Sequence, residues 1–351
     1  MDTYQEITPA LDDFIRRMPK VELHLHLEGS ITPRTLLRIA RRNNVDLPAR
    51  DEAGVAQLFN YQNFHEFLTV FMALARSLIY GEDFEQIAYE LGLHLADQNV
   101  RYAEVMLSAA QYYKRGMDLD EVVQGAASGF ARAARERGTV VNLAFDYGRQ
   151  FGVELAWQIL EGAVRNMRHT LVAWSIGGDE LNNPPESFAE VYAAARRAGL
   201  HLMAHAGEVV GPSSVWGAVD ALGAERLGHG IRSVDDPALL AHLRERDVAL
   251  DVCPTSNVRT GAVASAAAHP LRQLFDAGLR VTLNTDDPTF FDTTLNDEYR
   301  LAARMFGFDA DELSTLVLNA ARAAFLPEHE RAVLRRRIAD EIDLVRAESG
   351  V

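Results

Sequence analysis

The stretch VELHLHL, at residues 21–27, places two histidines, His24 and His26, two positions apart within an apolar run. If this run is a β-strand, side chains two apart share one face, so both imidazoles point the same way. Two adjacent imidazoles suit a metal ion better than a packed apolar core, although such a short spacing also arises by chance. The stretch therefore predicts a strand that contributes two candidate metal ligands.

Seven more short apolar runs follow the first, and amphipathic segments such as PESFAEVYAAARRAG and DPALLAHLRERD lie between them. These runs occupy residues 100–107, 140–146, 171–177, 201–207, 225–230, 248–253 and 280–287. Strands that alternate with helices form a parallel sheet, and eight of them favour a barrel over an open sheet. We therefore expect an α/β protein, a (β/α)8 TIM barrel with extra helices inserted after the first strand and at the termini.

The amino-acid composition and net charge indicate which kinds of binding partner to expect. The 351 residues are 48% hydrophobic and 24% charged, with a formal net charge of -15 at pH 7. This acidity argues against nucleic acid or an anionic membrane as the main partner. The first residues resemble no secretory signal, no apolar run approaches the ~20 residues of a membrane span, and the single cysteine, Cys253, excludes an intramolecular disulfide. We expect a cytoplasmic protein with a small-molecule substrate; the oligomeric state is unknown.

Polar side chains gather near the ends of several predicted strands. His205 and His229 lie near the ends of the fifth and sixth runs, and Asp286 and Asp287 close the eighth. In a β/α barrel the C-terminal ends of the strands converge on the catalytic face. Three imidazoles and one carboxylate suit zinc, which lowers the pKa of a bound water to roughly 7. The predicted metal ligands are His24, His26, His205 and Asp286.

Three neighbouring positions are candidates for acid–base chemistry and substrate binding. Glu208 in HAGE follows His205 by three residues, which makes it either a general acid or base or an ordinary exposed loop glutamate. His229 in GHG could accept a proton from the attacking water, orient that water, or be a buried structural imidazole. In NTDDP, strand alternation would let Asp286 bind metal while Asp287 meets substrate; the alternative is an Asx turn before Pro288.

The lysine content bears on the number of metal ions. Two-metal barrel hydrolases often bridge their metals with a carboxylated lysine on the fourth strand. The corresponding region here, LVAWSIGGDE, has no lysine, and the only lysines in the chain are Lys20 and Lys114. We therefore expect one Zn2+ per chain.

Five motifs in fixed order, PKVELHLHLEGS, GGDE, HAGE, LGHG and NTDDP, resemble the adenosine/adenine deaminase family of the amidohydrolase superfamily. The resemblance implies that residues 1–351 form a single metal-dependent deaminase barrel domain. It implies that Glu208 donates a proton to purine N1 and that His229 assists the water that attacks C6. It also implies substrate contacts from His26, Glu28, Gly178 and Asp287, with Asp287 at N7 and the Gly178 N–H at N3.

The resemblance leaves the substrate open. We expect adenosine or 2'-deoxyadenosine first, giving inosine or 2'-deoxyinosine and ammonia. Adenine, 6-aminodeoxyfutalosine and modified adenosines are alternatives, because Glu28 stands where many adenosine-specific members have aspartate near the sugar. Outside this family, the alternatives are another mononuclear-metal barrel hydrolase, acting on an amide, lactone or phosphoester, and a catalytically inactive binding protein.

Two further features receive structural interpretations. An apolar stripe at helical spacing follows the first strand, and core packing explains most of it, although the resemblance implies that such helices wall the sugar side of the pocket. Its members are Phe64, Phe67, Leu68, Phe71, Met72 and Ala75. Cys253 and Asn257, in DVCPTSN, follow the seventh strand, and we expect both to serve packing.

Overall fold

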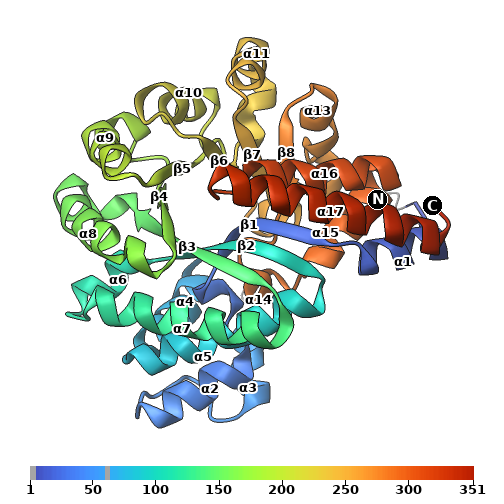
Figure 1. The fold of residues 1–351 in the computed structure, drawn as a ribbon. Coiled ribbons are helices and arrows are strands. Elements are labelled where there is room, and N and C mark those ends of the chain that lie inside the picture. The colour runs from blue at the N-terminus through green and yellow to red at the C-terminus, as the bar shows by residue number, and fades with distance from the viewer. Residues whose placement is uncertain (1–4, 60–63) are drawn as a thin grey trace.

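The computed structural model describes residues 5–59 and 64–351, and it leaves the side chains at 64–69 and 72 undescribed. Eight parallel strands form one barrel in the order of the sequence, as Figure 1 shows. They are β1 (Lys20–His26), β2 (Val100–Leu107), β3 (Val140–Gly148), β4 (Leu171–Gly177), β5 (His201–Ala206), β6 (Arg226–His229), β7 (Ala249–Val252) and β8 (Arg280–Leu283). A bridge between Leu25 and Asp286 joins the segment after β8 to β1. The predicted (β/α)8 barrel is confirmed.

Helices surround the strands and extend the fold where the sequence predicted extra ones. The helices between strands are α5 (Gly81–Asp97), α7 (Leu119–Arg137), α8 (Val153–Asn166), α9 (Ala189–Ala198), α10 (Pro212–Trp216), α11 (Pro237–Glu245) and α13 (Leu271–Asp276). The insertion after β1 holds α2 (Pro33–Arg42), α3 (Glu52–Leu58) and α4 (Phe64–Ser77). At the termini, α1 (Pro9–Arg17), α15 (Leu295–Phe306), α16 (Ala310–Ala323) and α17 (Glu328–Ser349) pack together (Figure 1).

Short helices follow several strands on the side where the strands end. They are α6 (Ala109–Lys114) after β2, α12 (Pro254–Arg259) after β7 and α14 (Pro288–Phe291) after β8. Each begins within five residues of its strand's last residue, so it fixes the main chain that leaves the barrel. The site described below is built largely from these junctions.

Local sequence explains where the helices begin and end. At α16, Asp309 accepts a hydrogen bond from the Glu312 N–H at 2.9 Å, and Glu312 accepts one from the Asp309 N–H at 3.2 Å. This reciprocal pair satisfies two N–H groups that have no partner inside the helix. At its C-terminal end, α7 stops at Gly138, whose φ of +85° lies in the left-handed region that glycine adopts without strain.

Apolar side chains fill most of the barrel, and one buried ion cluster lies inside it. Arg226 on β6 is 1% exposed and contacts Glu104 on β2 at 2.5 Å and Asp251 on β7 at 2.6 Å. Two carboxylates around one guanidinium keep the buried charges paired, which a low-dielectric interior requires. Among the described residues, no helix has both the length and the apolar character that a membrane crossing needs.

The predicted apolar stripe falls on α4, so its helical conformation is as expected. Of its members, Ala75 is buried and Phe71 is partly buried against the core. The side chains of Phe64, Phe67, Leu68 and Met72 lie outside the described residues.

Candidate metal centre and catalytic site

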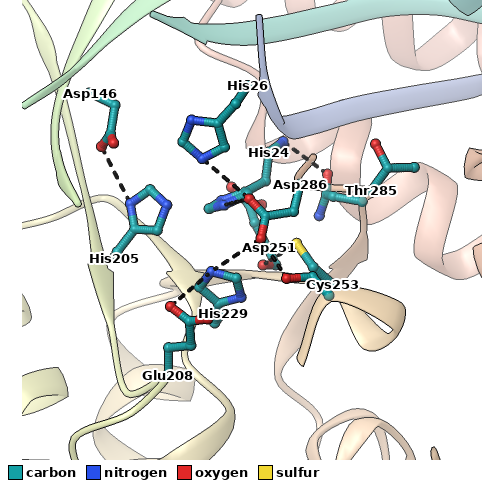
Figure 2. A network of polar contacts seen from close by, with 12 residues as sticks. His24, His26, Asp146, His205, Glu208, His229, Asp251, Cys253, Thr285 and Asp286 are labelled. Atoms are coloured by element: carbon teal, nitrogen blue, oxygen red, sulfur yellow. Dashed lines mark hydrogen bonds and ion pairs between the residues drawn. The ribbon is translucent and has the colours of Figure 1, made fainter. Parts of the chain in front are cut away.

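Four predicted ligands meet at one point on the barrel (Figure 2). One ligand-type atom from each of His24, His26, His205 and Asp286 lies within 4.8 Å of the others. Asp286 Oδ1 is 3.4 Å from His24 Nε2 and 3.2 Å from His26 Nε2. The strand arrangement explains this convergence, because β1 and β8 are joined at Leu25 and Asp286 while β5 faces them across the barrel.

The donor set fits a cation. His24 is 0% exposed, and neither of its ring nitrogens has a hydrogen-bond partner among the described residues. A buried polar atom without a partner is costly, and a metal ion would satisfy it. Imidazole nitrogens with one carboxylate form the ligand chemistry that zinc prefers. The residues present therefore fit the metal site that the sequence predicted.

The electrostatics of the cluster favour positive charge. Burial opposes protonation of His26, but Asp287 and Asp286 outweigh it and raise the pKa of His26 to about 10. Burial alone would raise the pKa of Asp286, but the imidazoles of His24 and His26, which lie 3.4 Å and 3.2 Å from its Oδ1, hold that pKa well below its ordinary value. The buried carboxylates thus favour a positive charge next to them. A single divalent cation bound between the side chains would provide that charge without protonating the histidines.

A second trio of ligand-type atoms, from His229, Cys253 and Asp286, shares the same carboxylate. Burial raises the pKa of the Cys253 thiol well above its ordinary value. Because only the thiolate is a good metal ligand, Cys253 is poorly suited to bind the ion. The first set is therefore the better candidate, and Cys253 is a buried free cysteine.

Backbone strain marks both His229 and Asp286. Their φ values are +64° and +66°, a region that side chains other than glycine seldom adopt. Such strain costs of order 1–3 kcal/mol and concentrates at functional sites. Next to His229, a Cβ on Gly228 would lie 2.5 Å from His24 Cε1, so only glycine lets the ring approach.

The structure corrects the argument made for NTDDP. The eighth strand was expected over residues 280–287, but β8 ends at Leu283. Strand alternation therefore does not separate the two carboxylates. Instead, the left-handed backbone at Asp286 turns its side chain toward the histidines, while Asp287 is the residue preceding α14.

Glu208 lies beside the ligand cluster and outside its four members. Its Oε2 is 3.5 Å from His229 Nε2, which is also 3.9 Å from Asp286 Oδ2 (Figure 2). The side chain of Glu208 is 22% exposed, whereas that of His229 is 1% exposed. The two predicted acid–base residues are thus neighbours, and Glu208 is the one with access to solvent.

Glu180, the last residue of GGDE, holds the loop that carries Glu208. Its carboxylate accepts main-chain hydrogen bonds from Gly207 at 2.6 Å, Val209 at 2.8 Å and Val210 at 3.0 Å. These donors lie on both sides of Glu208 in the chain. Sequence reasoning gave Glu180 no role, although the residue stands in a quoted motif.

The predicted substrate contacts surround the cluster at different depths. Asp287 packs on Gly29, where a Cβ would come within 1.9 Å of Asp287 Oδ1, and burial with the charge of Asp286 raises the pKa of Asp287 to about 7. Gly178, with φ of +85°, follows β4 beside Gln150 and lies outside the ligand set. Its predicted contact with N3 stays a prediction.

Glu28 is almost fully buried next to β1. Its Oε1 accepts hydrogen bonds from the Ser108 N–H at 3.0 Å and the Tyr112 hydroxyl at 2.8 Å. Its Oε2 is buried and has no hydrogen-bond partner among the described residues. Burial raises the pKa of Glu28. One oxygen is thus fixed by the protein, and the other has no donor among the residues that the structure describes.

Two residues that contact the ligands escaped the sequence reasoning. Asp146 Oδ1 lies 3.4 Å from His205 Nδ1, and Ser256 donates to Asp286 Oδ2 at 2.6 Å. Asp146 ends the run at 140–146, so the strand-end rule that found His205 could have found it. Ser256 gave no such signal, because its partner lies 30 residues away in sequence.

Neither lysine lies at the cluster. Lys20 is buried and donates to the Met18 carbonyl at 2.9 Å and the Gln98 carbonyl at 3.3 Å. Lys114 lies 4.3 Å from the centre of the Phe151 ring. No lysine is therefore placed to bridge a second metal, as the sequence predicted.

Comparison with known proteins decides the family. The family model described as adenosine deaminase matches residues 19–342. The chain belongs to the adenosine deaminase family. The resemblance drawn from the motifs is confirmed, and members of this family are hydrolytic deaminases of purine-type substrates.

Relatives in this family carry two different substrate names. The aminodeoxyfutalosine deaminase of Streptomyces coelicolor is 38% identical over 340 residues, covering 96% of this chain and 87% of the relative. The adenine deaminase of Cupriavidus necator is 36% identical over 326 residues, covering 93% of each chain. The expectation of adenosine as first substrate gains no specific support from these names.

Solved structures agree on the fold. An adenine deaminase from Arthrobacter aurescens superimposes with a TM-score of 0.87 at 31% identity, covering 93% of this chain and 99% of that one. An amidohydrolase from Burkholderia ambifaria with bound zinc gives a TM-score of 0.90 at 29% identity, covering 99% and 96%.

Proposed function

We propose that this protein hydrolyses the 6-amino group of a purine, using one zinc ion per chain. The observation that carries the proposal is the convergence of His24, His26, His205 and Asp286, with Glu208 and His229 beside them. When bound, a zinc ion in this site would supply a water molecule whose pKa is lowered to about 7. The remaining chemistry belongs to the side chains around it.

Glu208 is the proton carrier in this proposal. Addition of water across the N1–C6 bond gives N1 a proton and C6 a hydroxyl group. Glu208 delivers the N1 proton, since it is partly exposed and lies outside the ligand set. The hydroxyl proton then moves to the amino group, the C6–N bond breaks, and ammonia leaves a 6-oxopurine.

The other substrate contacts follow from purine chemistry. N3 and N7 are hydrogen-bond acceptors, so each needs a donor. The Gly178 N–H is a donor at N3, and Asp287 is a donor at N7 when it holds a proton. A buried site that pairs these atoms rejects rings that lack them, because its own polar groups would be left without partners.

For the substituent on N9 we propose that of 6-aminodeoxyfutalosine, which is larger than ribose and ends in a carboxylate. A cavity of about 640 Å³ is lined by Ser30 and Pro288, which follow Glu28 and Asp287 closely in the chain, and also by Phe59, Arg259 and three carboxylates, those of Glu90, Asp292 and Asp297, among others. Arg259 has no ion-pair or hydrogen-bond partner within the described part of the chain, so its guanidinium is available to a carboxylate. The names of the Streptomyces relatives agree with this choice.

Adenine is the second candidate. It is favoured by the relatives named adenine deaminase and by Oε2 of Glu28, which has no hydrogen-bond partner among the described residues and would accept a hydrogen bond from N9–H of a free base. In a nucleoside, N9 carries no proton, and the same oxygen would have to accept from a sugar hydroxyl.

One experiment tests the reaction and the metal together. Zinc-loaded protein is incubated with adenosine, adenine and 6-aminodeoxyfutalosine, and released ammonia and purine absorbance are followed with and without a chelator. We expect stoichiometric ammonia from at least one purine and its loss on chelation. Zinc-loaded protein that releases no ammonia from any of them would contradict the proposal.

A further inference from the structure

A chain of buried polar contacts leads from His229 away from the metal cluster. Asn257 Nδ2 lies 3.1 Å from His229 Nδ1, and Asn257 Oδ1 lies 3.1 Å from His269 Nε2. The main-chain N–H of Leu271 then donates to His269 Nδ1 at 3.1 Å. Asn257, His229 and His269 are 0%, 1% and 4% exposed, so water does not compete for these bonds.

The direction of every bond in this chain follows from its far end. A main-chain N–H can only donate, so His269 Nδ1 must accept from Leu271. A neutral imidazole carries one proton, which therefore lies on His269 Nε2 and is donated to Asn257 Oδ1. The Asn257 amide nitrogen consequently faces His229 and donates to its Nδ1.

The opposite orientation of the Asn257 amide is excluded by the same reasoning. It would direct the amide N–H at His269 Nε2, which would then have to accept. Both nitrogens of His269 would be acceptors, and an imidazole with its one proton cannot provide two. Protonation of His269 does not help, because Nδ1 is occupied by the Leu271 N–H; burial also lowers the pKa of His269 to about 3.

We propose that Asn257 and His269 are positioning residues that hold His229 as the tautomer protonated on Nε2. In this state His229 is a hydrogen-bond donor toward the reacting groups and does not accept a proton. Its Nε2–H faces Glu208 Oε2 at 3.5 Å and Asp286 Oδ2 at 3.9 Å, both of which are acceptors. Of the two catalytic roles considered for His229, this tautomer favours orienting the water, and the proton transfers fall to Glu208.

The catalytic part of this inference rests on the proposed function, whereas the tautomer does not. The tautomer is read from two-bond proton–nitrogen correlation spectra of 15N-histidine-labelled, zinc-loaded protein, with His229 assigned by comparison with His229→Gln. We expect Nδ1 of His229 to show the shift of an unprotonated ring nitrogen and Nε2 that of a protonated one. Protonated Nδ1, or both nitrogens protonated near neutral pH, overturns the proposal.

A pair of variants at His269 tests the positioning role. His269→Gln keeps a donor toward Asn257 and an acceptor for the Leu271 N–H, so the tautomer and kcat should be retained. His269→Glu offers acceptors only, so the Asn257 amide reverses and the proton of His229 moves to Nδ1. We expect kcat to fall at least ~10-fold with KM nearly unchanged and the zinc content retained.

Asn257→Asp provides an independent route to the same change. Its two oxygens accept from His269 Nε2–H and require a proton on His229 Nδ1, so it should match His269→Glu in both spectrum and kcat. If His269→Glu and Asn257→Asp shift the tautomer and kcat stays at the wild-type value, the positioning role is wrong. If no purine is turned over by any form, the proposed function fails, and the spectra still decide the tautomer.

Discussion

Ser256 donates a hydrogen bond from Oγ to Asp286 Oδ2 at 2.6 Å, and both side chains are buried. The bond orients the carboxylate so that Oδ1 faces His24 and His26. Groups that orient metal ligands typically contribute 10–100-fold to metal affinity. We expect Ser256→Ala to weaken zinc binding by about 10-fold or more, measured by competition with a chromophoric chelator. Ser214→Ala removes a buried hydroxyl that has no hydrogen-bond partner in the described part of the chain, and it should leave the affinity unchanged.

The metal content follows from the ligand set and the positions of the lysines. We expect about one zinc per chain in purified protein, by elemental analysis. His24→Ala should lose the zinc and with it the activity, because His24 would contribute a ligand nitrogen that has no hydrogen-bond partner among the described residues. His329→Ala changes a histidine whose side chain is 80% exposed and should retain both. Two tightly bound metals per active chain would show this prediction to be wrong.

Glu208 should be separable from metal binding, because it lies outside the four-residue ligand set. Glu208→Gln keeps the shape of the side chain and removes its ability to carry a proton. We expect full zinc content and a kcat lower by at least ~10²-fold, the usual scale for a general acid or base. Glu245→Gln, an exposed glutamate on α11, serves as the control. Loss of zinc in Glu208→Gln would instead place Glu208 among the ligands.

Glu180 should affect catalysis through the loop that it holds. Glu180→Gln replaces a carboxylate that accepts three main-chain N–H bonds with an amide that has one acceptor oxygen. Hydrogen bonds to charged groups contribute about 1.5–3 kcal/mol, so unfolding free energy should fall and the loop carrying Glu208 should lose its position. We expect kcat to fall about 10-fold with zinc retained.

The matched control for Glu180 is Glu225. Glu225 also accepts a main-chain N–H, from Leu202 at 3.0 Å, but it stands before β6 at the opposite end of the barrel. Glu225→Gln should lower stability and leave kcat unchanged. An equal loss of kcat in both variants would mean that Glu180 acts only through overall stability.

The sequence predicted the barrel well because strand formation depends on local patterns. The runs at residues 100–107 and 171–177 coincide with β2 and β4, since apolar, β-branched side chains suit strands buried on both faces. The largest departure is the run at 280–287, which extends beyond the last residue of β8, Leu283. Its last residues are polar, and the left-handed backbone at Asp286 depends on the bridge to Leu25, which no local pattern reveals.

The clustering of the four predicted metal ligands could be foreseen for a related reason, since strand ends in a barrel meet at one face whatever their distance in sequence. The supporting contacts could not be foreseen. Glu180 binds the loop at Gly207, and Asn257 binds His229, across 27 and 28 residues. Such pairings are set by the packing of loops after the strands are in place. Asn257 was expected to serve packing alone, and the structure adds the contact with His229.

Arg259 offers the sharpest test of the substrate. It lines the cavity of about 640 Å³ together with Ser30 and Pro288, and it has no ion pair within the described residues. If the carboxylate of 6-aminodeoxyfutalosine binds there, Arg259→Gln removes a charge-assisted pair with that substrate alone. We expect KM for 6-aminodeoxyfutalosine to rise about 10-fold or more, while kcat/KM for adenosine and adenine stays within about twofold.

The wild-type protein can be compared across the candidate substrates. We expect kcat/KM to be highest for 6-aminodeoxyfutalosine, because it fills both the purine contacts and the cavity, while cytidine lacks the N7 that Asp287 is proposed to read. Arg259→Glu should raise KM for 6-aminodeoxyfutalosine further than Arg259→Gln does, since it places a negative charge opposite the substrate carboxylate. A preference of the unaltered protein for adenine by tenfold, about 1.4 kcal/mol in transition-state binding, would rule out the larger substrate. It would assign the free oxygen of Glu28 to N9–H and leave the deaminase chemistry in place.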